Sequence, residues 1–307
     1  MASTEGRPPL RVGARGSSLS RVQTMAVVKR LNELNPGEVF EFLAIRTSGD
    51  DPSSRPYGPQ GVKGLFVKEI ESALLGGQID LAVHSAKDLA SELPDGLVLG
   101  PAMERAEPWD ALVCAQGLGL ATLPMGARVG TSSLRRGSFL KAFREDLEIM
   151  PLRGNVETRL AKVGRDFEAI LLAKAGLVRL APGHGHAVED LPPEVMPPSP
   201  GQGQLALEFR EGDHRVSALL QGLDHEASGL ALAAERAFMR RLGLGCTAPV
   251  GALCQDGPGG RLVMRAALAA EGRGIILAGG ESAYRDLAAA AALGRLVAEK
   301  ILEGTPR

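Results

Sequence analysis

The stretch from Ile79 to Asp88 constrains the fold of this chain more than any other part of it. Apolar and β-branched residues fill its first half, and the run stops at the mostly polar segment from His84 to Asp88. This pattern is typical of a buried parallel strand whose carboxyl end opens into a site. Because ligands of open α/β sheets bind just beyond such strand ends, Asp88 is the first candidate functional residue. The alternative is that Ser85 to Asp88 only cap the strand and start a helix, and for this stretch taken alone the alternative is favoured.

Length, charge and cysteine content bound the remaining possibilities. At 307 residues the chain exceeds what one hydrophobic core serves, which predicts two or three domains. A formal net charge of -1 gives no general attraction to nucleic acid or to an anionic membrane, so neither is an expected partner. Cys114, Cys246 and Cys254 lack CxxC spacing, so we expect free thiols and no metal site. The absence of a secretory signal and of a long apolar run predicts a cytoplasmic protein.

The first part of the chain alternates strands and helices. Strands are expected at 10–14, 39–45 and 79–85, and helices begin near Ser17 and Lys63, the second ending at Gly76-Gly77. Short connections imply a parallel sheet with its carboxyl ends on one edge, which Arg15, Ser17, Lys63 and Asp88 would share. Residues 51–62, rich in Pro, Gly and Ser, predict a loop over the site that could act as a lid.

The pattern restarts near residues 104–110, which predicts a second domain with strands at 111–115, 127–130, 149–152 and 169–173. Val129-Gly130 followed by Ser132-Ser133 repeats Val12-Gly13 followed by Ser17-Ser18, so both domains are expected to share a strand-turn-helix design. Residues 182–200 are interpreted as a connection in which His184 and His186 are solvated. A strand at 205–209 would return the chain to the first domain, and two crossings predict a hinge.

Positive charge gathers at the helix starts of the second domain. Two arginines in the first turn after Thr131 oppose the helix dipole at a cost of about 0.3 to 1 kcal/mol each, which an anion would offset. Two solvated arginines are the alternative. The basic residues expected at these loop ends are Arg135, Arg136, Arg153, Arg159 and Arg179. Their number favours a ligand with several carboxylates or phosphates.

The C-terminal region predicts a small α+β unit, with helices at 227–242 and 284–302 and strands near 250–254, 262–269 and 275–278. Cys246 lies in a glycine-rich loop, where backbone approaches a ligand closely. A small buried filler is the alternative for a free cysteine, and Cys254 fits that alternative better.

Five motifs in order resemble the hydroxymethylbilane synthase family, also called the porphobilinogen deaminases, from about Leu10 to the end of the chain. They are Val83-His84-Ser85-Ala86-Lys87-Asp88, Gly130-Thr131-Ser132-Ser133-Leu134-Arg135-Arg136, Leu152-Arg153-Gly154-Asn155, Gly201-Gln202-Gly203 and Gly245-Cys246-Thr247-Ala248-Pro249-Val250-Gly251. The resemblance implies an α/β fold, with two periplasmic-binding-protein-like α/β domains joined by a hinge and a small α+β C-terminal domain. The expected domains are 1–104 with 204–222, 105–203, and 223–307.

The resemblance also implies an activity. Members of the family join four porphobilinogen molecules head to tail, release ammonia at each step, and hydrolyse off linear hydroxymethylbilane. A dipyrromethane cofactor primes the chain, and Cys246 matches its thioether attachment residue. Asp88 matches the catalytic carboxylate, which stabilises positive charge on pyrrole nitrogens and moves protons. A monomer is what the family suggests.

Further residues match family positions that hold the cofactor or the substrate. The cofactor positions are Lys87, Thr131, Ser132, Ser133, Arg135, Arg136, Arg153, Gly154, Asn155 and Arg159. The substrate positions are Arg15, Ser17, Gln23, Lys63, Phe66, Ser85, Arg179 and Gln202. Departures occur at Pro59 and Val62, where the family often has lysine and glycine, and at Leu89-Ala90 after Asp88, where it often has a small apolar residue and proline.

Two other functions are alternatives to this one. A hinged two-domain protein that binds a polycarboxylate without catalysis is disfavoured by the loop position of Cys246 and by the missing secretory signal. A transferase using nucleoside triphosphates is disfavoured because no GxxxxGK[ST] loop is present.

Overall fold

The computed structural model describes residues 8–48, 67–115, 117–244, 248–270 and 274–305. The chain divides into two compact units, the first made of Met1–Glu104 and Gln204–Gly229 and the second of Arg105–Gly203 and Leu230–Arg307. Each unit is described by itself. Among the described residues, no helix combines the length and the apolar content that crossing a bilayer requires.

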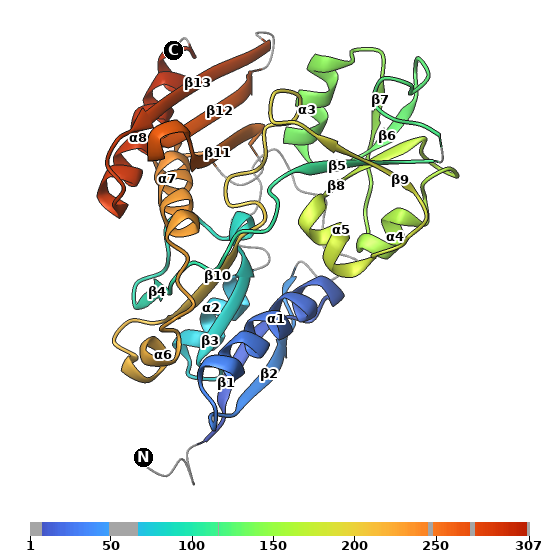
Figure 1. The fold of residues 1–307 in the computed structure, drawn as a ribbon. Helices are drawn as coiled ribbons and strands as arrows, with labels where there is room; N and C mark the ends of the chain where they lie inside the picture. The colour runs from blue at the N-terminus through green and yellow to red at the C-terminus, as the bar shows by residue number, and fades with distance from the viewer. Residues whose placement is uncertain (1–7, 49–66, 116, 245–247, 271–273, 306–307) are drawn as a thin grey trace. The chain divides into compact units, whose positions relative to one another are not determined.

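A five-stranded sheet of order β2-β1-β3-β10-β4 forms the centre of the first unit (Figure 1). Strand β1 is parallel to β2 and β3, as predicted, whereas β10 runs antiparallel to both β3 and β4. The elements are β1 (Leu10–Arg15), α1 (Ser18–Leu34), β2 (Phe40–Ile45), α2 (Lys68–Leu75), β3 (Leu81–Ser85), the short 3-10 helix η2 (Ala86–Asp88), β4 (Leu97–Leu99), β10 (Leu205–Arg210) and α6 (His214–Leu219).

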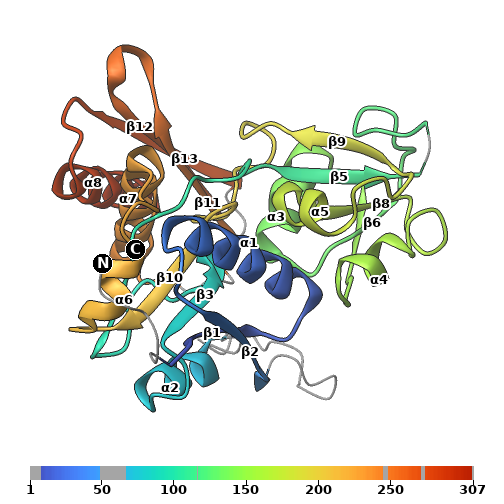
Figure 2. The same cartoon turned by 60° about the horizontal axis from the view of Figure 1, so that its bottom comes forward.

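Helices cover both faces of this sheet (Figure 2). On one face Leu81 and Val83 of β3 pack with Val27 and Leu31 of α1, in a core that α6 also joins. On the other face Ala82 packs in a separate cluster with the α2 side chains. The alternation along β3 therefore buries both faces of the strand and carries its carboxyl end to the turn that bears Asp88.

The second unit contains a sheet of the same design, with order β7-β6-β8-β5-β9. Here β6 is parallel to β7 and β8, and β5 runs antiparallel to β8 and β9. The elements are β5 (Asp110–Cys114), β6 (Arg128–Gly130), α3 (Leu134–Phe143), β7 (Glu148–Met150), α4 (Val156–Leu160), β8 (Ala169–Ala173), α5 (Lys174–Leu180) and β9 (Ala187–Leu191). The prediction that residues 182–200 are only a connection is wrong, because β9 lies within them and pairs with β5.

The predicted repeat of a strand, a turn and a helix is confirmed. Ser17 caps α1 by accepting a hydrogen bond from the backbone N–H of Ser20, and Ser133 caps α3 by accepting one from Arg136. In each case a short strand leads into a polar turn whose serine satisfies a free N–H group of the helix.

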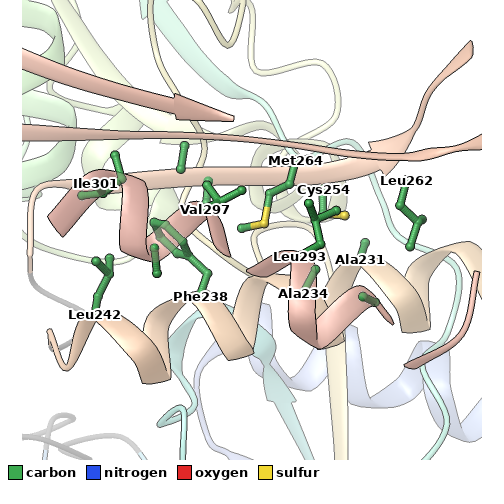
Figure 3. Close-up of a cluster of buried hydrophobic side chains, with 14 of the residues drawn as sticks. Ala231, Ala234, Phe238, Leu242, Cys254, Leu262, Met264, Leu293, Val297 and Ile301 are labelled. Carbon is green, nitrogen blue, oxygen red and sulfur yellow. The ribbon is translucent and has the colours of Figure 1, made fainter. Parts of the chain in front are cut away.

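The C-terminal part of the second unit is an antiparallel sheet of order β11-β12-β13 packed against two helices. Its elements are α7 (Glu226–Leu242), β11 (Val250–Asp256), the 3-10 helix η3 (Pro258–Gly260), β12 (Leu262–Ala270), β13 (Gly274–Ser282) and α8 (Leu287–Glu303). Figure 3 shows Phe238, Met264 and Val297 meeting in this core. The predicted helix start at Tyr284 is wrong, because Asp286 caps α8 through the N–H of Ala289.

Candidate active site

Asp88 stands at the carboxyl end of β3, at the end of the 3-10 turn that follows the strand. The carboxylate is exposed, and the structure gives it no hydrogen bond or ion pair to another described residue. Ala86, two residues earlier, is buried and donates its N–H to the carbonyl of Gln204 at 3.0 Å. A turn that is hydrogen-bonded to Gln204 therefore presents a carboxylate with no partner in the described part of the chain.

Several predicted substrate residues surround a small cavity beside Asp88, with a volume of about 70 Å³. The cavity is lined by Arg15, Ser17, Leu19, Ser20, Gln23, Val67, Ile70, Val83, His84, Ser85 and Asp88. The Ser85 hydroxyl donates to the Gln23 side-chain oxygen at 3.3 Å, which joins β3 to α1 at the cavity wall. The structure thus brings together five of the predicted residues, Arg15, Ser17, Gln23, Ser85 and Asp88. Lys87, in the same turn, is half-buried.

In the second unit, Arg135 and Arg136 converge on one carboxylate that sequence reasoning missed. Arg135 Nη2 lies 2.7 Å from Asp110 Oδ2, and Arg136 Nη2 lies 2.7 Å from Asp110 Oδ1. All three side chains are buried. Burial and the neighbouring Arg136 lower the pKa of Arg135, while Asp110 acts in the opposite direction. Part of the anion expected at this helix start is therefore a side chain of the protein itself.

Backbone groups and one predicted residue complete the support of these arginines. Arg136 Nη1 donates to the Leu171 carbonyl at 3.1 Å, and Arg135 Nη1 donates to the Pro197 carbonyl at 2.5 Å. Gln202, predicted as a substrate residue, is buried and donates its side-chain N–H to Asp110 Oδ1 at 3.1 Å. Since one carboxylate faces two guanidinium groups, this group of three charges keeps one excess positive charge.

The turns that carry the other predicted polar residues are tightly bonded. Ser132 donates its hydroxyl to the Leu152 carbonyl at 2.8 Å, and Thr131, which is buried, accepts from the N–H of Ser133 at 3.2 Å. Asn155 caps α4 through the N–H of Thr158. Gly154, just before it, has a positive φ of 114°, which glycine adopts without strain. These groups shape the carboxyl edge of β6 and β7.

Three further predicted arginines lie near the helix starts and ends that follow this sheet. Arg153 is exposed, whereas Arg159 and Arg179 are half-buried. Burial lowers the pKa of both half-buried arginines, and the charge of Arg136 lowers the pKa of Arg159 further. No carboxylate among the described residues is paired with either of them. Cations desolvated in this way favour an anionic ligand.

A second network, centred on the buried Glu235 carboxylate, joins segments that are far apart in the chain. Sequence reasoning missed it as well. Arg105 Nη1 lies 2.7 Å from Glu235 Oε1, and Arg105 Nε donates to the Gln202 carbonyl at 2.8 Å. The same Glu235 carboxylate accepts from the N–H groups of Gly201 and Cys254. No local sequence signal marks these partners, because they are far apart in the chain.

Three predicted site residues, Lys63, Phe66 and Cys246, lie outside the described residues, as do Pro59, Val62 and the predicted lid at 51–62. Within the described residues, no three His, Cys, Asp or Glu side chains are grouped so as to hold a metal ion. His184 and His186, expected in a solvated loop, are half-buried and stack with ring centroids 5.5 Å apart.

Comparison with known proteins places the chain in a family. Residues 10–218 match the family model "Porphobilinogen deaminase, dipyromethane cofactor binding domain", and residues 230–303 match "Porphobilinogen deaminase, C-terminal domain". The chain belongs to the porphobilinogen deaminase family. The resemblance predicted from the five motifs is confirmed.

Individual relatives agree with this assignment. A porphobilinogen deaminase of Roseiflexus sp. (strain RS-1) is 50% identical over 244 residues, covering 79% of this chain and 80% of the relative. One from Moorella thermoacetica is 43% identical over 295 residues, covering 95% of this chain and 93% of the relative. Among solved structures, an ancestral cationic amino acid solute binding protein aligns with a TM-score of 0.44 and 14% identity, covering 70% of this chain and 87% of that one. Similarity to porphobilinogen deaminases thus extends over almost the whole chain.

Proposed function

We propose that this chain is a hydroxymethylbilane synthase, a transferase of tetrapyrrole biosynthesis. It deaminates four porphobilinogen molecules, joins them head to tail onto a covalent dipyrromethane, and releases linear hydroxymethylbilane by hydrolysis. The observation that carries this proposal is the match of both porphobilinogen deaminase family models, over residues 10–218 and 230–303. The predicted dipyrromethane cofactor agrees with the description of the first of these models.

Asp88 is the proposed catalytic residue. Its carboxylate is exposed at the end of a fixed turn, and it borders the cavity that Arg15 and Ser17 also line. Positive charge develops on pyrrole nitrogens when ammonia leaves and when the new carbon–carbon bond forms. A fixed anion in reach stabilises that charge, and its oxygens accept and return the pyrrole N–H proton.

The arginines of the second unit are the proposed binding groups for acetate and propionate side chains. The chemistry of the donors fits a ligand rich in carboxylates, since the buried group at Asp110 keeps an excess positive charge and burial lowers the pKa of Arg159 and Arg179. Guanidinium forks pair with carboxylates through two parallel bonds. The residues proposed to hold the cofactor are Lys87, Thr131, Ser132, Ser133, Arg135, Arg136, Arg153, Gly154, Asn155 and Arg159, with Cys246 as the attachment. When bound, the dipyrromethane supplies the pyrrole carbon that is joined to the incoming substrate.

The residues proposed to bind substrate are Arg15, Ser17, Gln23, Lys63, Phe66, Ser85, Arg179 and Gln202. The Gln202 side chain also donates a hydrogen bond to Asp110, so its amide has a structural role in addition to the proposed one.

The proposed domains are 1–104 with 204–222, 105–203, and 223–307. Three separate sheets support this division, one for each proposed domain. A monomer in the cytoplasm is proposed as well, and the buried free thiols of Cys114 and Cys254 are consistent with a reducing compartment.

The test is a turnover assay of the purified full chain with porphobilinogen. The proposal predicts release of ammonia and formation of a linear tetrapyrrole, and it predicts that Asp88→Asn lowers kcat by roughly 10²- to 10⁴-fold while substrate still binds. Binding of porphobilinogen without ammonia release by the wild-type chain would instead support a polycarboxylate-binding protein.

A further inference from the structure

A buried, hydrogen-bonded pair of a histidine and a glutamate lies beside the proposed active site of the first unit. His84 Nε2 on β3 is 2.9 Å from Glu208 Oε2 on β10, and the two side chains are 3% and 0% exposed. In the register of these strands, Ala206 is opposite His84 and Ala82 is opposite Glu208, so the two side chains are diagonal neighbours on one face of the sheet. The pair joins β3 to β10 at the centre of the sheet.

Stability alone does not explain this pair. Removing a carboxylate from water costs several kcal/mol, and apolar side chains of similar volume often replace such pairs without loss. Glu208 makes the cost higher, since its second oxygen, Oε1, has no hydrogen-bond partner among the described residues. A second acid, Glu71 of α2, is close enough that Glu208 raises its pKa and His84 lowers it, in addition to the larger effect of burial.

The pair is directly connected to the turn that carries Asp88. His84 is the fourth residue before Asp88, and both residues line the same cavity of about 70 Å³. Two residues after His84, the N–H of Ala86 donates to the carbonyl of Gln204, the residue just before β10, at 3.0 Å. Residues 84–86, which make these two contacts, lead directly into the 3-10 helix η2 that ends at Asp88. The His84 imidazole is therefore part of the wall beside which the Asp88 carboxylate lies.

We propose that Glu208, acting through its hydrogen bond to His84, is a positioning residue for the Asp88 carboxylate. The backbones of β3 and β10 are already paired, and the bond holds the His84 imidazole in one orientation in the wall of the cavity, so that Asp88 is presented beside a fixed surface. A displacement of about 1 Å at a reacting group costs up to 10²-fold in rate. This proposal rests on the proposed function, since it concerns the orientation of the group that carries the reaction.

Two variants of similar side-chain length separate a positioning role from a packing role. Glu208→Gln keeps an oxygen that accepts the hydrogen bond from His84, whereas Glu208→Met fills the same space without an acceptor. Both variants remove the Glu208 carboxylate, and neither introduces a new charge into the sheet. Arg30→Gln, which breaks an exposed ion pair with Glu33 in the same unit, is the control.

The measurement is kcat and KM for porphobilinogen, together with the thermal unfolding midpoint of each variant. We expect Glu208→Gln and Arg30→Gln to keep kcat within about threefold, and Glu208→Met to lose about 10-fold or more in kcat with KM nearly unchanged. Wild-type kcat in a folded Glu208→Met variant would overturn the proposal, as would equal losses in the Gln and Met variants. If Glu208→Met does not fold, a loss of about 10-fold or more in the folded Glu208→Gln variant overturns it, and retained activity supports it. A wild-type chain without turnover would overturn the proposed function itself, and this proposal with it.

Discussion

Asp110 on β5 and Arg136 on α3 form a buried ion pair in which Nη2 and Nε of the arginine lie 2.7 and 2.9 Å from the same carboxylate oxygen. The other oxygen of Asp110 faces Arg135 at 2.7 Å. The strand and the helix are thereby joined at the point where the proposed carboxylate-binding cluster begins. One buried acid faces two buried cations, which leaves one excess positive charge in this group.

Replacing Asp110 should destabilise the folded chain strongly. Asp110→Asn keeps the shape of the side chain but leaves two buried guanidinium groups without a counter-ion, so we expect a loss of about 3 to 5 kcal/mol in the free energy of unfolding. The control is Glu168→Gln, which breaks the exposed pair with Arg128 and should cost about 1 kcal/mol or less. Chemical denaturation measures both. Equal losses of unfolding free energy in the two variants would show that the buried ion pair stabilises the fold no more than the exposed one.

Gly203 should be intolerant of a side chain. Its φ is +86°, and a Cβ there would stand 2.3 Å from the carbonyl oxygen of Ala106. Gly212 has a similar φ of +77° but no heavy atom within 4 Å of such a Cβ. We expect Gly212→Ala to lower the free energy of unfolding by about 1 to 2 kcal/mol because of its backbone conformation. Gly203→Ala should lower it by about 1 to 3 kcal/mol more, because of the clash. The difference between their unfolding free energies isolates the clash, and its absence would contradict this geometry.

Asp80 should make stability depend on pH in the acid range. Burial raises the pKa of Asp80, but hydrogen bonds from Arg11 and Arg210 outweigh burial and hold the pKa below its usual value of 3.8. A carboxyl whose pKa is lowered by folding stabilises the protein above the unfolded pKa, and this contribution is lost as the pH falls through the folded pKa. The difference in unfolding free energy between wild type and Asp80→Asn should therefore be constant near neutral pH and shrink below a pH of about 4. A difference that does not change down to a pH of about 2 would contradict this linkage.

Cys114 and Cys254 should be unreactive in the native protein and reactive after denaturation. Burial, with a smaller effect of Glu235, raises the pKa of Cys254 to about 12, and burial together with Glu189 raises that of Cys114 to about 11. Neither thiol should be alkylated in the native protein at a pH of about 8, because the thiolate is the reactive form. After denaturation, alkylation should label these two thiols and leave Cys246 blocked by its thioether bond. A third labelled thiol in active protein would contradict the proposed attachment.

Most strands and several helix starts were predictable because short stretches of sequence determine them. Apolar runs bounded by Gly, Pro and Ser identified eleven strands of the described residues, from β1 to β13, and serine caps identified the starts of α1 and α3. Strands β4 and β9 were missed. The two acidic residues of β9, Glu189 and Asp190, interrupt its apolar pattern, and the strand gains its structure by pairing with β5, as β4 does by pairing with β10. Helix α8 begins at Leu287, after the cap at Asp286, and not at the predicted Tyr284.

The arginine-rich set was predictable as a local signal of charge at helix starts, but its internal partners were not. Asp110 lies 26 residues from Arg136, and Glu235 lies 130 residues from Arg105. No spacing rule links such pairs, since they meet only when the sheets and helices have packed. The pair of His84 and Glu208 was missed for the same reason, with 124 residues between them.

The intact mass of the protein, before and after addition of porphobilinogen, tests the central claim most directly. The account predicts that the purified chain is heavier than its sequence by two linked pyrrole units, and that added porphobilinogen raises the mass in steps of one porphobilinogen less ammonia. The added mass should be absent from Cys246→Ser. An active protein whose mass equals that of the unmodified sequence throughout would contradict the account.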